Sequence, residues 1–150
     1  MQFRDAVRAT AGLADQYRFG LQAVRRADRQ RIRCRNSGSV TGSVNVDSAL
    51  RESHPDDHRW DYAIGFCEAR QAEVVFWVEV HPASSHHVED VLEKLRWLKQ
   101  WLSSEAPRLE EIPPRFVWVA SGGVALSPGS RQRRQLAGNG IHLVVERLVL

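Results

Sequence analysis

Residues 74–81 read Val74-Val75-Phe76-Trp77-Val78-Glu79-Val80-His81 and predict a strand in the middle of a sheet. The apolar run from 74 to 78 is typical of a strand that is buried on both faces. Side chains alternate along a strand, so Glu79 and His81 project to the same face. We expect the strand to end at Pro82, because proline has no backbone N–H for a ladder bond.

A second predicted strand covers residues 60–66, Trp-Asp-Tyr-Ala-Ile-Gly-Phe, and Asp61 stands at its beginning. If this strand lies next to the first, the carboxylate of Asp61 sits beside Glu79 at the sheet edge. An acid near apolar strands costs free energy unless it has partners or a metal. The pair therefore favours a divalent metal site. The alternative is structural: Asp61 pairs with an arginine, and Glu79 is satisfied by His81 or a backbone donor.

The helix predicted at about residues 86–103 carries one apolar stripe. The stripe consists of Val88, Val91, Leu92, Leu95, Leu98 and Leu102. Lys94 and Trp101 fall beside it and Trp97 falls opposite. Either the amino-terminal segment covers the two tryptophans, or they form a surface for a protein partner or a homodimer.

The other predicted elements alternate between helix and strand. They are helices at 3–18 and 21–27, a strand-like arginine run at 29–35, a strand at 42–47 that ends on Asp47, a strand at 116–120, a short basic helix near 131–134 and a closing strand at 141–150.

Length and composition favour one domain over residues 1–150. No apolar run approaches the roughly 20 residues of a membrane-spanning helix, and the first residues lack a secretory signal pattern. We therefore expect a cytoplasmic protein with no membrane association. Cys34 and Cys67 fit neither a disulfide framework nor a metal spacing, and are expected to be ordinary thiols.

Charge is distributed unevenly along the chain. Residues 1–36 hold nine arginines against three acids, residues 37–114 hold seven basic residues against fourteen acids, and residues 115–150 hold five against one. An acidic centre between basic ends suits a metal site bordered by arginines that hold a nucleic acid. The candidate nucleic-acid contacts are Arg29, Arg31, Arg33, Arg131, Arg133 and Arg134. The alternative is a solvated arginine-rich surface.

The order of predicted elements, αβββαβ with acids on the second and third strands, resembles the restriction-endonuclease-like superfamily with its PD-(D/E)XK motif. The resemblance covers about residues 40–120. It implies a mixed central sheet flanked by helices, here with an added carboxy-terminal helix and strand. Asp61 takes the place of the motif aspartate and Glu79 that of the second acid, while His81 stands where the family has lysine.

The resemblance implies a nuclease that hydrolyses DNA or RNA with Mg²⁺ or Mn²⁺. Asp61 and Glu79 would ligate the metal, and Asp47, or else Glu52, would add a third carboxylate. His81, or Lys94 from the following helix, would serve the attacking water. The alternative is a non-catalytic interaction module that keeps the fold and binds a protein or nucleic acid. Zinc held by His54 and His58 is disfavoured, because these residues fall in a predicted loop.

Overall fold

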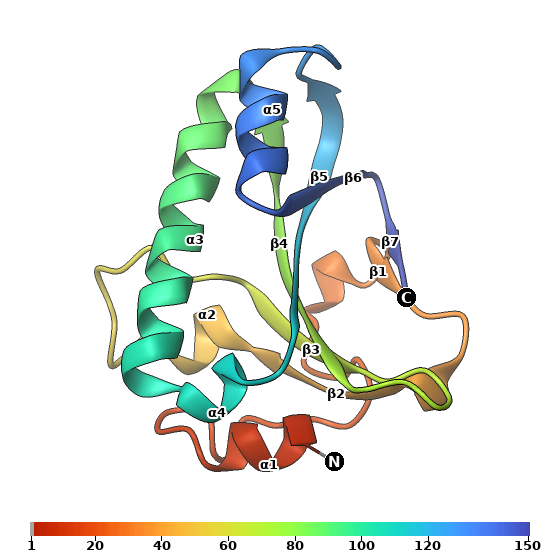
Figure 1. Ribbon diagram of the computed structural model, residues 1–150, viewed down its shortest axis with the longest axis vertical. Helices are drawn as coiled ribbons and strands as arrows, with labels where there is room; N and C mark the ends of the chain where they lie inside the picture. Colours follow the sequence, from red (N-terminus) through yellow and green to blue (C-terminus); the bar gives the residue numbers. More distant parts are fainter. Residues whose placement is uncertain (1) are drawn as a thin grey trace.

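The structure is a computed structural model that describes residues 2–150. Its centre is a mixed five-stranded sheet in the order β2-β3-β4-β5-β6 (Figure 1). The strands are β2 (Val40–Asn45), β3 (Tyr62–Phe66), β4 (Val74–Ser84), β5 (Pro114–Ala125) and β6 (Ile141–Val145). Neighbours from β2 to β4 are antiparallel, whereas β4, β5 and β6 are parallel. The expected mixed sheet is therefore confirmed.

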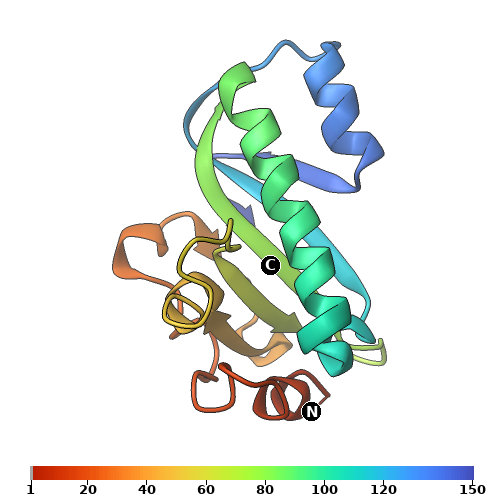
Figure 2. The ribbon, with the colours of Figure 1, turned by 90° about the vertical axis from the view of Figure 1, so that its left-hand side faces the viewer.

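Helix α3 (Ser85–Glu105) runs along one face of the sheet beside β4 (Figure 2). All six residues of its predicted stripe are buried, as is Trp101. The shorter helices are α1 (Gln2–Arg8), α2 (Val46–Ala49), α4 (Pro107–Glu110) and α5 (Arg131–Gly138). Leu136 of α5 and Leu109 of α4 join the same apolar cluster as α3, so these helices cover one face of the sheet.

The opposite face is covered by chain that is mostly not helical. Val24, Ile32 and Leu148 pack there against Tyr62 and Val78. Ile32 belongs to β1 (Ile32–Arg33), which pairs in parallel with β7 (Leu148–Val149). Since both faces are covered, the apolar run of β4 is buried on both sides, as its sequence predicts. Trp77 packs toward α3 and Val78 toward the other face.

Several predicted bounds in the amino-terminal third are wrong. The helix expected over 3–18 ends at Arg8, and Gly12 follows with φ of +84°, outside the helical region. The helix expected over 21–27 is only a 3₁₀ turn, η1 (Arg26–Asp28), and a second such turn is η2 (Ser37–Ser39). The strand expected over 29–35 is reduced to the two residues of β1.

Pro82 does not end its strand, because β4 continues to Ser84. The pairing with β3 has already stopped at Val78, and the register with β5 shifts between His81 and Ala83. The missing N–H of Pro82 therefore falls where the ladder is already irregular. Asp47 is the second residue of α2, which begins directly after β2 ends at Asn45, and it does not lie in a strand.

Of the two alternatives for Trp97 and Trp101, the partner surface is wrong for Trp101, which is only 2% exposed. Its ring packs edge-on to Trp77 and is stacked on Trp97. Trp97 is partly buried, and its Nε1–H donates to Asp57 in the polar loop after α2. That loop also places the His54 ring edge-on to Trp97. Over residues 2–150, no helix combines the length and the apolar character needed to cross a membrane.

Candidate active site

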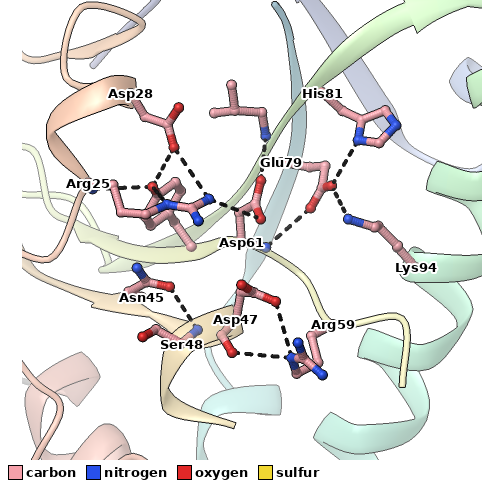
Figure 3. A network of polar contacts seen from close by, with 12 residues as sticks. Arg25, Asp28, Asn45, Asp47, Ser48, Arg59, Asp61, Glu79, His81 and Lys94 are labelled. Atoms are coloured by element: carbon pink, nitrogen blue, oxygen red, sulfur yellow. Dashed lines mark hydrogen bonds and ion pairs between the residues drawn. The ribbon is translucent and has the colours of Figure 1, made fainter. Parts of the chain in front are cut away.

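The two predicted acids meet where β3 begins beside β4. The antiparallel register pairs Tyr62 with Val78, so the residues just beyond this pair, Asp61 and Glu79, face each other. Strand alternation places Glu79 on the same side as Trp77, toward α3. Asp61 is 7% exposed and Glu79 is fully buried. Figure 3 shows the two side chains close together, with His81 and Lys94 beside Glu79.

Side-chain hydrogen bonds hold the acids where the backbone ladder stops. The Asp61 N–H donates to Oε1 of Glu79 at 3.2 Å. The Val80 N–H donates to Oδ2 of Asp61 at 3.0 Å. Each carboxylate thus accepts a hydrogen bond from the other strand, and this exchange fixes the orientation of both acids.

Lys94 reaches the acid pair from α3. Its Nζ lies 2.5 Å from Oε2 of Glu79, and its side chain is 21% exposed. Lys94 lies beside the apolar stripe of α3, as its sequence position predicts. Because this stripe packs on the sheet, the Lys94 ammonium lies next to the buried carboxyl group of Glu79. His81 reaches the same oxygen less closely, with Nδ1 at 3.7 Å. Of the predicted site residues, Asp61, Glu79, His81 and Lys94 are therefore brought together.

Burial controls the protonation of this cluster. It raises the pKa of Glu79 to about 8, with a further contribution from the charge of Asp61, against the opposing effect of Lys94. Burial also raises the pKa of Asp61. For Lys94, burial opposes the charged form, but Glu79 outweighs it and the pKa is raised. Burial and the Lys94 charge lower the pKa of His81, so its imidazole is neutral at pH 7.

Arg25 closes the outer side of the cluster, and sequence reasoning did not select it. Its Nη2 lies 3.8 Å from Oδ1 of Asp61 and 3.7 Å from Oδ2 of Asp28. Its Nε–H donates to the Tyr62 hydroxyl at 3.1 Å, and that hydroxyl donates to Asp28 at 2.5 Å. Burial, with the hydrogen bond to Asp28, raises the pKa of Tyr62 to about 12. The only signal in the sequence was the dense arginine run that begins at Arg25.

Asp47 is not part of the acid pair. Its Oδ1 accepts from Arg59 and its Oδ2 from Arg51, both at 3.1 Å. Within residues 2–150, no group of three or more His, Cys, Asp or Glu side chains is arranged to hold a metal ion. The predicted triad of Asp61, Glu79 and Asp47 is therefore not assembled in this conformation.

Two carboxylates nevertheless suit a hard cation. Magnesium is often held by only one or two protein carboxylates, with water and substrate phosphate completing its coordination. The donor set of Asp61 and Glu79 fits this chemistry, and the Lys94 ammonium already supplies a positive charge at Glu79. A metal ion bound at Oε2 of Glu79 would compete with the Lys94 ammonium for that oxygen.

The predicted nucleic-acid contacts fall into two separate groups. Arg29, Arg31 and Arg33 lie in or next to β1, on the face opposite α3. Arg131, Arg133 and Arg134 lie on α5, which packs on the α3 side. Arg31 Nη1 donates to the carbonyl of Ala120, and Arg134 Nη1 to that of Gly129. The elements that carry the two groups therefore pack on opposite faces of the sheet.

The histidines that suggested zinc are engaged elsewhere. His54 Nε2 lies 2.9 Å from Oε2 of Glu105, and His58 Nε2 lies 3.6 Å from Oε2 of Glu93. Comparisons with known protein families, with curated proteins and with solved structures found no significant match.

Proposed function

We propose that this protein is a metal-dependent nuclease that hydrolyses phosphodiester bonds of DNA or RNA at Asp61, Glu79 and Lys94. The order α1, β2, β3, β4, α3, β5, with the short elements β1, α2 and α4 between them, supports this proposal, because the resemblance implies an αβββαβ core. The antiparallel β2-β3-β4 unit followed by a parallel β5 agrees with a mixed sheet of that kind. Asp61 precedes the second of these strands and Glu79 lies in the third.

The observation that carries the proposal is the contact between Lys94 Nζ and Glu79 Oε2 at 2.5 Å. The resemblance places a lysine two residues after the second acid, where this chain has His81. Lys94 supplies an ammonium at the same acid from a different element. A replacement of that kind preserves the charge that the chemistry needs, although the sequence motif is altered.

Each residue then has a defined task. Asp61 and Glu79 would hold Mg²⁺ or Mn²⁺, which supplies an activated water and neutralises charge on the leaving oxygen. Lys94 would orient the attacking water and stabilise developing negative charge. The neutral imidazole of His81 can accept a proton. Its Nε2 is buried and, in the part of the chain that is described, has no hydrogen-bond partner.

A second candidate is a non-catalytic module that keeps this fold and binds nucleic acid. The hydrogen bonds within the acid pair favour it, because Asp61 and Glu79 are already satisfied by Val80, Asp61 N–H and Lys94. The tryptophan surface gives this candidate no support, since Trp101 is buried.

The test is cleavage of labelled single- and double-stranded DNA and RNA with Mg²⁺ or Mn²⁺. Lys94 and Lys99 are the two lysines of the chain, so Lys99→Met is a matched control for Lys94→Met. Lys99 lies over the ring of Phe116, away from the acids. We expect Lys94→Met to lower the cleavage rate by about 100-fold or more and Lys99→Met to leave it unchanged. Folded wild-type protein that cleaves none of these substrates would favour the binding module.

A further inference from the structure

The segment that carries Arg25 is fastened across β2 and β3. Arg18 and Ser43 exchange two backbone hydrogen bonds, each of 2.9 Å. The Ala23 N–H donates to the Ser43 hydroxyl, and the Arg25 N–H donates to the Tyr62 hydroxyl at 3.2 Å. Val24 is buried on the sheet. The backbone at Arg25 is therefore held in place beside Asp61.

The guanidinium of Arg25 is held by one edge and open on the other. Nε–H donates to Tyr62, and Cζ lies 5.9 Å from the centre of the Tyr62 ring. Nη2 lies near Asp28 and Asp61, but at 3.7 and 3.8 Å it is beyond ordinary hydrogen-bond distance. The side chain is 49% exposed. Guanidinium groups bind phosphate oxygens through paired N–H groups. The half-exposed guanidinium of Arg25 can therefore donate N–H groups to a phosphate.

Asp61 links this guanidinium to the acid pair. In the chain alone, Arg25 partly compensates the charge of Asp61 on one side, while Lys94 contacts Glu79 on the other. A cation at the acids would repel the Arg25 guanidinium, and a phosphate bound to Arg25 would offset that repulsion. The acids would repel the phosphate, and the cation would offset that repulsion in turn.

We propose that Arg25 binds the phosphodiester group of the substrate, and that this binding and divalent-cation binding at Asp61 and Glu79 strengthen each other. The inference rests on the proposed function, since it assumes a cation at the acid pair. Linkage requires the effect to be reciprocal: the phosphodiester tightens the cation and the cation tightens the phosphodiester by the same factor. Removing Arg25 has two opposite effects, because it frees Asp61 for the cation and also deletes the phosphate contact.

The experiment is calorimetric titration of Mn²⁺ into wild type, Arg25→Gln and Arg26→Gln. Each titration is run with dimethyl phosphate or with an equal concentration of chloride. Arg26 is an exposed neighbour on the same segment, and within residues 2–150 no hydrogen bond or ion pair joins its side chain to the acid pair. Thermal unfolding of each variant checks that it is folded.

We expect dimethyl phosphate to lower the Mn²⁺ Kd of wild type and Arg26→Gln by about fivefold or more. Arg25→Gln should bind Mn²⁺ at least as tightly as wild type in chloride and show no effect of dimethyl phosphate. Wild type that binds Mn²⁺ with the same Kd in both solutions overturns the coupling and leaves the proposed function standing. Wild type that binds no Mn²⁺ in either solution overturns both.

Discussion

The protonation of Glu79 predicts how the stability of the metal-free protein depends on pH. Burial raises its pKa from 4.5 to about 8, so between these values the folded chain keeps a proton that the unfolded chain releases. The contribution to stability is complete below the unfolded pKa and is lost as pH rises through the folded pKa. The slope is about 1.4 kcal/mol per pH unit, or about 4 kcal/mol between pH 5 and pH 8.

Glu79→Gln removes this titration and keeps the shape of the protonated side chain. We expect the variant to gain stability relative to wild type as pH rises from 5 to 8, by as much as about 4 kcal/mol. Urea unfolding at several pH values, followed by tryptophan fluorescence, measures the difference. Glu89→Gln is the control, because Glu89 lies on α3 with an exposed side chain and forms its ion pair with Arg96, also exposed. A difference between wild type and Glu79→Gln that stays constant from pH 5 to pH 8 would refute the reasoning.

Three further predictions concern the cation and the core. The Mn²⁺ affinity of wild type should rise between pH 6 and pH 8, because the cation displaces a proton from Glu79; calorimetry that gives a constant Kd contradicts this. Asp61→Asn should abolish Mn²⁺ binding, whereas Asp47→Asn should leave the Kd unchanged because arginines engage both Asp47 oxygens; equal losses would place Asp47 at the site. Gly65→Ala should lower the free energy of unfolding by about 1–3 kcal/mol, since the new Cβ would lie 2.3 Å from Thr41 Oγ1. An unchanged free energy of unfolding in urea would show that the surrounding side chains shift to make room for this Cβ.

The regular elements around the acid pair could be predicted because each has a periodic pattern. The apolar run of β4 and the stripe of α3 identify a central strand and the helix that packs on it. Together they bring Lys94 to Glu79. Asp61 could be placed because it opens the strand next to β4.

The remaining features depend on irregular chain, for which sequence patterns give no register. Arg25 meets Asp61 through a segment held by isolated hydrogen bonds to Ser43 and Tyr62, and no periodicity indicates that path. The burial of Trp101 depends in part on the stacked ring of Trp97, which the loop after α2 contacts. Tertiary packing decides both cases.

The most direct test of the central claim is a crystal structure of the protein soaked in Mn²⁺, with the metal located by anomalous scattering. We predict an anomalous peak within ligand distance of carboxylate oxygens of both Asp61 and Glu79, with Lys94 Nζ displaced from Oε2 of Glu79. A crystal that shows no peak there, with Lys94 still paired to Glu79, would contradict the assignment of this cluster as a metal-dependent active site.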